Sequence, residues 1–236
     1  MSLDLDIQRA LVMMAHPDDP EFSAGGTVAV WTQAGVEVGY IIITSGDKGT
    51  DNPTIDSTEL MRIREAEQCA AAARLGVKHV VFLRYRDNEL QPTIELRREL
   101  AREICRFRPD AVICQDPTTF YFGPTGINHP DHRAAGEAVL AAIYPTARDW
   151  INLPELKAEG LQPHKVREIL LSATLSPDYW VDITPVIDDK IAALIEHRSQ
   201  IKDPDGLAQR IYERSRVMAE GRPMEYAERF KRISMP

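Results

Sequence analysis

Short apolar runs alternate along the chain with longer amphipathic stretches. The runs at 11–15, 38–44, 80–83 and 111–114 are rich in Val, Ile, Leu and Met, and polar or glycine-containing segments follow them. Runs of this length and composition are typical of strands that are buried on both faces of a parallel sheet. The pattern therefore predicts an α/β fold, with a Rossmann-like open and mostly parallel sheet and helices on both of its faces.

Helices are expected between these strands. Apolar spacing and end signals place them at 25–34, from the capping-box pair Asp56 and Glu59 to Leu75, and at 94–107. The adjacent Gly25 and Gly26 are expected to form a tight turn into the first of these helices.

The pattern changes after a long loop that follows the fourth strand. From Val166 onward we expect strands at 169–173 and 179–183, and helices from 185 to about 201 and from about 207 to 219. This part should close the sheet edge or cover the mouth of a pocket. No internal repeat interrupts the chain, so we predict a single domain over residues 1–236.

Composition narrows the classes of function. The 236 residues are 44% hydrophobic and 27% charged, with no apolar stretch long enough to span a bilayer. The net charge of -8 and the lack of a basic stripe argue against nucleic acid as a partner. Small-molecule chemistry is therefore favoured.

The N-terminus and the cysteines bear on the cellular compartment. Residues 1–6 are acidic where a signal peptide would carry basic residues, which favours a cytoplasmic protein. The three cysteines, Cys69, Cys105 and Cys114, are an odd number in segments that are predicted to be buried, so a disulfide framework is not expected.

Two His/Asp clusters follow two of the predicted strands. Residues 16–19 come directly after the first strand, and residues 129–132 come after the loop that leaves the fourth. In a sheet with the order 3-2-1-4, the carboxyl ends of the first and fourth strands lie side by side. Both clusters should then converge in one crevice.

Their side chains are suited to a divalent metal ion. Two imidazoles and one carboxylate leave a coordination position open for water, as in catalytic sites. A structural zinc site is disfavoured because neither cluster contains cysteine. Dinucleotide binding is also disfavoured, because the turn after the first strand has two carboxylates in place of the Gly-x-Gly-x-x-Gly sequence that receives a pyrophosphate.

These residues carry a resemblance to a known family. Residues 15–19, with Glu21, Phe22 and 25–27 following, resemble the N-terminal signature of the PIG-L/LmbE-like N-acetylglucosaminyl deacetylases, and residues 129–132 resemble the second signature. Family-like features also occur at 64–67, 75–77 and 226–230. The resemblance implies a zinc-type deacetylase, in a family whose members act on glucosaminyl thiol precursors, phosphatidylinositol-linked glucosamine, chitobiose or glycopeptides.

The resemblance also implies roles for individual residues. The metal ligands fall on His16, Asp19 and His132, and Asp18 takes the place of the general base. Adjacent carboxylates on a turn point in different directions, so one can bind the metal while the other accepts a proton from the attacking water. One divalent ion is expected, and zinc and ferrous iron both remain open because both accept these ligands.

Three further positions concern the reacting amide. His129 falls on the family position that stabilises the oxyanion and protonates the amine, with Asp131 as a partner of either His129 or His132. Some family members carry a tyrosine two residues before this histidine, where this chain has Ile127. Whether Tyr121 replaces that tyrosine is left open.

Other polar residues have less specific readings. Arg64 falls on a family position that contacts substrate, but an ordinary pair with Glu67 or Asp47 explains it equally well. Glu21 is not expected to bind the metal, and at most it should contact one of the ligands from behind. The remaining histidines are expected at the surface or at helix ends; they are His79, His164 and His197.

The leading hypothesis is metal-dependent deacetylation of an N-acetylglucosamine-type substrate or glycoconjugate. One alternative is an amidase acting on a glucosaminyl thiol S-conjugate. Another is a sugar- or metal-binding module without turnover, which would leave Asp18 and His129 unexplained beside a complete ligand set. The expected partner is a small amino sugar, and a homo-oligomer is expected because related enzymes often form one.

Overall fold

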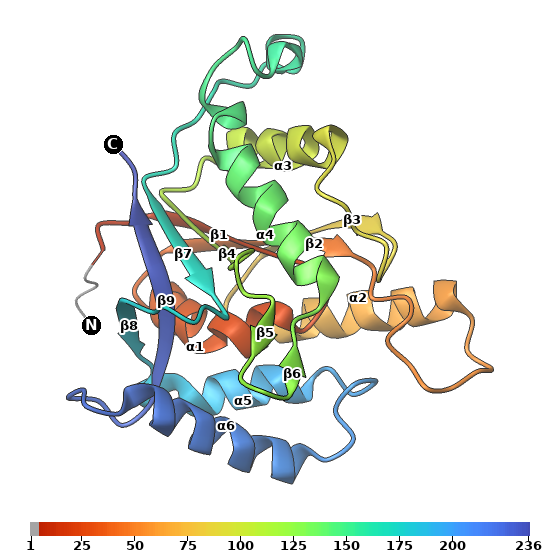
Figure 1. Ribbon diagram of the computed structural model, residues 1–236, viewed down its shortest axis with the longest axis vertical. Helices are drawn as coiled ribbons and strands as arrows, with labels where there is room; N and C mark the ends of the chain where they lie inside the picture. Colours follow the sequence, from red (N-terminus) through yellow and green to blue (C-terminus); the bar gives the residue numbers. More distant parts are fainter. Residues whose placement is uncertain (1–4) are drawn as a thin grey trace.

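The computed structural model describes residues 5–236, and within them seven strands form one sheet in the order β3-β2-β1-β4-β7-β9-β8 (Figure 1). The strands are β1 (Arg9–Met14), β2 (Glu37–Thr44), β3 (His79–Tyr85), β4 (Ala111–Gln115), β7 (Glu168–Ser172), β8 (Tyr179–Asp182) and β9 (Ala227–Ser234). Residues 1–4, which belong to the N-terminal segment used for the compartment prediction, lie outside the described residues.

The predicted strand order is confirmed at the centre of the sheet. β1 pairs in parallel with β2 on one side and β4 on the other, and β2–β3 and β4–β7 are also parallel. β9 was not predicted, and it runs antiparallel between β7 and β8. The carboxyl ends of β1 and β4 therefore do lie side by side.

Helices cover both faces of this sheet (Figure 1). They are α1 (Asp19–Gln33), α2 (Ser57–Arg74), α3 (Ile94–Phe107), α4 (Pro130–Ile143), α5 (Ile187–Ile195) and α6 (Pro204–Ala219), with short 3₁₀ helices at Thr146–Arg148, Pro154–Lys157 and Thr184–Val186. Helices α1, α2, α5 and α6 pack on one face, and α3 and α4 pack on the other. The α/β prediction is confirmed.

β1 shows why the sequences of the central strands are continuous apolar runs. Val12 and Met14 belong to the core on the α1 side, whereas Leu11 and Met13 belong to the core on the α4 side, and all four are fully buried or nearly so. Alternate side chains of a strand point to opposite faces, and here both faces are covered. Every buried position of the strand, from Ala10 to Met14, is therefore apolar.

Several helix predictions need correction. α4 occupies a segment that was predicted to be part of a long loop, and the helix expected from 185 to 201 ends at Ile195 after a short 3₁₀ helix. The same loop also contains a small antiparallel hairpin of β5 (Tyr121–Phe122) and β6 (Gly126–Ile127). Asp56 does precede α2, but its side chain makes no capping bond.

The turn predicted at Gly25 and Gly26 is wrong, because α1 already begins at Asp19. Gly26 instead permits close packing, since a Cβ atom there would lie 2.6 Å from Cγ2 of Ile183. The N–H groups of Gly26 and Thr27 also donate to the buried carboxylate of Glu228, in the middle of the helix. The glycine pair therefore marks a contact between α1 and the C-terminal part of the chain.

Two compartment-related features can be checked against the structure. No helix among residues 5–236 is long and apolar enough to cross a membrane. Cys105 and Cys114 are buried as expected, whereas Cys69 is exposed.

Candidate active site

The two His/Asp clusters meet at the carboxyl ends of β1 and β4. His16 lies two residues after β1, Asp19 is the first residue of α1, and His132 is in the first turn of α4. Asp18 has a left-handed backbone, with φ at 84°, which turns the chain sharply from the strand into the helix. The backbone N–H of His16 then donates to Oδ2 of Asp19 at 2.8 Å.

Three side chains form a triangle, in which each histidine contacts a different oxygen of Asp19. Nδ1 of His16 lies 3.3 Å from Nε2 of His132 and 3.3 Å from Oδ2 of Asp19, and Nε2 of His132 lies 3.2 Å from Oδ1 of Asp19. Neighbouring ligands of a tetrahedral zinc ion at its usual bond lengths are about 3.3 Å apart. These three side chains could therefore hold a metal ion with one position left open.

Two residues that the sequence analysis missed hold these ligands in place. Gln115, at the end of β4, donates to Oδ2 of Asp19 at 2.9 Å and accepts from the N–H of Ala15 at 3.2 Å. The side-chain oxygen of Asn128 lies 3.2 Å from Nδ1 of His132. Such a contact leaves Nε2 of His132 free to face a metal.

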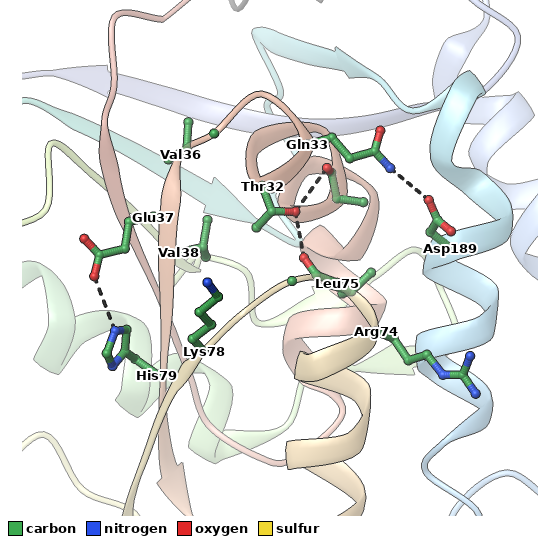
Figure 2. A pocket seen from close by; sticks show the side chains of 13 residues that line it. Thr32, Gln33, Val36, Glu37, Val38, Arg74, Leu75, Lys78, His79 and Asp189 are labelled. Carbon is green, nitrogen blue, oxygen red and sulfur yellow. Dashed lines mark hydrogen bonds and ion pairs between the residues drawn. The ribbon is translucent and has the colours of Figure 1, made fainter.

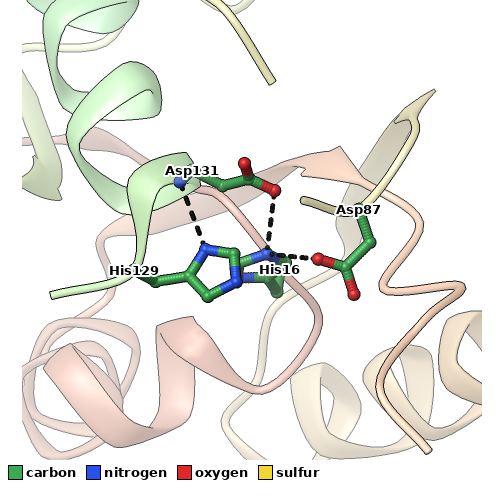
Figure 3. Close-up of side chains that lie close together, drawn as sticks. All are labelled: His16, Asp87, His129 and Asp131. Carbon is green, nitrogen blue, oxygen red and sulfur yellow. Dashed lines mark hydrogen bonds and ion pairs between the residues drawn. The ribbon is translucent and has the colours of Figure 1, made fainter. Parts of the chain in front are cut away.

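The other nitrogen of His16 faces two carboxylates. Its Nε2 lies 3.1 Å from Oδ1 of Asp87 and 3.3 Å from Oδ2 of Asp131, as Figure 3 shows. The expectation for Asp131 is thus corrected, because its carboxylate contacts His16 rather than the ring of His129 or His132. It also accepts from the backbone N–H groups of Asn88 and Leu90, so its position is fixed.

The surrounding carboxylates favour a positive charge at the ring of His16. Burial opposes a charge on His16, but contacts with Asp131, Asp19 and Asp87 outweigh burial and raise its pKa to about 12. Burial likewise opposes a charge on Asp19, yet His132 and His16 hold the pKa of that carboxyl well below its usual value. A cation bound among these groups would be stabilised by the same charges.

Asp18 lies beside the triangle and is held by its own partners. One of its carboxylate oxygens lies 3.2 Å from Nη2 of Arg64, and its N–H donates to Gln68 at 2.8 Å. Burial raises its pKa to about 6, although Arg64 acts in the opposite direction. A carboxylate with a pKa near neutrality is suited to accept a proton.

Arg64 is buried, and its terminal nitrogens are already in use. Besides Asp18, it donates to the backbone oxygens of Pro17 and Gly46, at 2.8 and 2.9 Å. The expected alternative of a pair with Glu67 or Asp47 is not what the structure shows. Arg64 instead ties the turn before α1 to the loop after β2.

His129 is the residue just before α4, and its ring lies beside those of His16 and His132. Its Nδ1 accepts from the N–H of Asp131 at 3.2 Å, and its ring meets that of His16 edge-on at 4.6 Å between centroids. Burial and the positive charge of His16 lower its pKa. No residue from 5 to 236 makes a hydrogen bond to its Nε2, which is therefore available to a substrate.

The hairpin carries the two positions at which a tyrosine was considered. Tyr121 on β5 lies directly opposite Ile127 on β6, and both side chains are exposed. Directly opposed residues of an antiparallel pair project from the same face. Tyr121 is thus next to the position that bears a tyrosine in some family members.

A buried network lies behind Asp18, and it corrects the expectation for His197. That residue is fully buried, and its Nε2 lies 3.1 Å from Oε2 of Glu21, which is itself fully buried. Gln68 donates to the other oxygen of Glu21 at 2.9 Å and accepts from the N–H of Asp18. Glu21 lies behind the ligands as expected, but no sequence signal pointed to its partner.

The other two histidines have ordinary roles. His79 makes an exposed ion pair with Glu37 at 3.3 Å, as its surface reading predicted. His164 is half-buried, and its Nε2 bonds the backbone oxygen of Pro109 at 2.7 Å.

A cavity of about 630 Å³ lies away from the His/Asp clusters (Figure 2). It is bounded by the ends of α1 and α2 and by the beginnings of β2 and β3, at the amino ends of those strands. None of the His/Asp cluster residues lines it. Charge and ligand geometry, rather than cavity size, therefore locate the candidate active site.

The fold and this His/Asp group define an α/β protein with a candidate metal centre at the end of its sheet. The sequence profile of the PIG-L family, described as GlcNAc-PI de-N-acetylase, matches residues 11–143, which include both clusters. The chain therefore belongs to the PIG-L family and is a deacetylase of that family.

Individual relatives agree with this assignment. The chain is 35% identical to diacetylchitobiose deacetylase of Thermococcus kodakarensis, over 84% of this chain and 72% of that protein. It is 31% identical to a probable N-acetyl-alpha-D-glucosaminyl L-malate deacetylase 2 of Bacillus cereus, over 82% and 84% of the two chains. The structure of N,N'-diacetylchitobiose deacetylase from Pyrococcus horikoshii matches with a TM-score of 0.88 and 31% identity, covering 97% of this chain and 85% of that one.

The Glu21–His197 pair generates a prediction about stability. Replacing His197 with Ala leaves a buried carboxylate without its cationic partner, so we expect the free energy of unfolding to fall by about 3–5 kcal/mol. Urea denaturation measures this loss. The matched control His79→Ala removes an exposed pair and should have little effect.

A second substitution separates lost charge pairing from lost packing. Adding Glu21→Gln to His197→Ala removes the uncompensated charge and should restore part of the stability. If it restores nothing, the pair is not what stabilises this region.

Proposed function

We propose that this chain is a metal-dependent deacetylase that hydrolyses the N-acetyl group of a small amino-sugar substrate. The observation that carries the proposal is the triangle of His16, Asp19 and His132, whose side chains contact one another at 3.2–3.3 Å and could hold a metal ion. The named relatives act on acetylated glucosamine compounds, which fits the same reaction. A single domain, a homo-oligomer and a cytoplasmic location stay predictions.

Zinc is the ion we propose for this triangle, with ferrous iron as the alternative. A bound divalent ion supplies Lewis acidity to the amide carbonyl and makes water easier to deprotonate. The chain itself supplies the orientation of the ligands. Asp87 and Asp131 fix the ring of His16 from behind, Gln115 fixes Asp19, and Asn128 fixes His132.

Asp18 is proposed as the general base. It is adjacent to Asp19 in sequence but makes its contacts with Arg64 and Gln68, and 16% of its side chain remains exposed. It can therefore accept a proton from the attacking water without leaving the support of Arg64. A direct contact between Arg64 and substrate stays a prediction.

His129 is proposed to assist at the other side of the amide. With Nδ1 accepting from the N–H of Asp131, its Nε2–H can donate to the carbonyl oxygen. To pass that proton to the departing amine, the ring must first gain a proton at Nδ1, which displaces the N–H of Asp131. Whether Tyr121 adds a further donor stays open, as its place opposite Ile127 permits it.

The activity can be tested by acetate release from a panel of N-acetylglucosaminides and by release of the free amine from a glucosaminyl thiol S-conjugate. We expect activity that is lost on chelation and restored by zinc or ferrous iron, because the attacking water must be ionised near neutral pH. Full activity in metal-free protein would contradict the mechanism. Cleavage of the S-conjugate alone would favour the amidase alternative, and no turnover with bound metal would favour a binding module.

The roles of the residues can be separated by measuring metal content and kcat together. Asp18→Asn and His129→Ala should retain metal and lower kcat by roughly two to four orders of magnitude, the usual worth of a positioned acid or base. His132→Ala should lose metal as well as activity. If the Asp18→Asn protein is metal-free, the proposed base is instead a ligand.

A further inference from the structure

Asp18 has a backbone conformation that few residues other than glycine adopt. Its φ of 84° and ψ of -28° are close to those of the third residue of a type II turn, where glycine is preferred. Pro17 comes directly before it, and proline is common at the second position of such turns. A residue with a side chain is strained at positive φ unless its surroundings hold it there. The neighbours of Asp18 must therefore keep it in this conformation.

This conformation also replaces an interaction that the sequence would otherwise provide. Asp18 is the N-cap of α1, where an aspartate with an extended backbone usually accepts a hydrogen bond from an N–H group of the first turn. The carboxylate of Asp18 makes no such bond. The donor would be the N–H of Glu21, because Pro20 at the second helical position has none. The carboxylate lies beside Arg64 instead.

Two residues of α2 hold Asp18 from one face of that helix. Arg64 and Gln68 are four residues apart, so their side chains project from the same side of α2. Both are buried. Arg64 contacts the carboxylate at 3.2 Å, whereas Gln68 accepts from the backbone N–H at 2.8 Å. Gln68 is thus the residue that acts on the backbone of Asp18, and its bond fixes the peptide group between Pro17 and Asp18.

The amide of Gln68 is itself oriented by buried partners. Its Nε2 donates to Oε1 of Glu21 at 2.9 Å, so its oxygen faces the N–H of Asp18. A carboxylate can only accept hydrogen bonds, and it therefore determines which end of the amide faces it. The other oxygen of Glu21 lies 3.1 Å from Nε2 of His197, at the end of α5. Gln68, Glu21 and His197 are all buried, where water competes little for these contacts.

We propose that Gln68 is a positioning residue that holds Asp18 in its left-handed conformation and away from the helix cap, so that the carboxylate stays available as the general base. Glu21 and His197 act behind it by orienting its amide. A displacement of about 1 Å in a reacting group can cost on the order of 100-fold in rate, so this support affects turnover. The proposal rests on the deacetylase function proposed above, in which Asp18 is the base.

A crystal structure of the Gln68→Met protein tests the positioning without any turnover. Methionine has a similar length but is only a weak hydrogen-bond acceptor for the N–H of Asp18. We expect the φ of Asp18 to become negative and its carboxylate to accept from the N–H of Glu21 as an ordinary cap. An Asp18 that stays left-handed would contradict the proposal. If Gln68→Met does not fold, Gln68→Asn replaces it with the same expectation, because its shorter amide cannot reach both Asp18 and Glu21.

Kinetics separate a positioning role from a general structural one. Gln68→Met should lower kcat roughly 10- to 100-fold, while KM and metal content stay close to those of the parent protein. In protein that already carries Asp18→Asn, the same substitution should lower kcat by no more than about twofold, because Gln68 acts through Asp18. Equal losses of kcat in both backgrounds would show that Gln68 does not act through the base.

Ala72→Gly is the matched control for α2. Ala72 is buried one turn beyond Gln68 on the same side of the helix, and glycine there weakens the helix without removing a contact of Asp18. We expect a lower Tm with an unchanged kcat. A loss of kcat as large as that of Gln68→Met would mean that a weaker helix, and not the lost bond to Asp18, lowers the activity.

The structural and kinetic readouts distinguish this proposal from the deacetylase proposal. If the parent protein releases no acetate but Asp18 changes conformation in the Gln68→Met crystal, Gln68 does hold Asp18 and the enzymatic function is rejected. If the parent turns over and the Gln68→Met protein keeps both a left-handed Asp18 and the parent kcat, the positioning role alone is rejected.

Discussion

The concentration of negative charge around one imidazole is the constraint on which the rest of the site depends. Asp19, Asp87 and Asp131 come from three different elements, and each places a carboxylate oxygen within 3.3 Å of a ring nitrogen of His16. Buried carboxylates are costly unless a cation or donors compensate them. These carboxylates raise the pKa of His16 and so favour a positive charge on its ring, and a divalent ion facing Nδ1 would compensate the same charges.

The sheet and its loops are arranged to keep those groups in place. β1 and β4 are neighbours, so Gln115 at the end of one strand can bond both Ala15 and Asp19 at the end of the other. Asp18 is supported by residues that are distant in sequence. Its N–H bonds Gln68, Gln68 bonds Glu21, and Glu21 contacts His197, and these three side chains are buried. A substitution in the C-terminal half can thus affect the candidate base without touching it.

The sequence predicted the central sheet because its strands are buried on both faces and carry continuous apolar runs. β9 could not be recognised in the same way, since charged residues interrupt it and Ala227 and Phe230 are its only fully buried apolar residues. α4 was missed because it packs through small residues, and Gly136 lies so close to β4 that a Cβ atom there would be 2.3 Å from the backbone oxygen of Gln115.

The residues of the candidate site could also be predicted from the sequence only in part. His16, Asp19 and His132 could be proposed because two clusters follow adjacent strands and resemble a family signature. Gln115 and His197 could not, because their contacts with Asp19 and Glu21 span 96 and 176 residues and depend on the finished fold. Asp131 was recognised as a supporting residue, but its partner was not, since only the structure places it against His16.

Anomalous diffraction at the zinc edge, from crystals of the zinc-loaded protein, tests the central claim most directly. The account predicts one peak at bonding distance from Nδ1 of His16, the carboxylate of Asp19 and Nε2 of His132, with Asp87 and Asp131 not coordinated. A peak on the opposite side of the ring, bonded to Nε2 of His16 and to Asp87, His129 or Asp131, would contradict it.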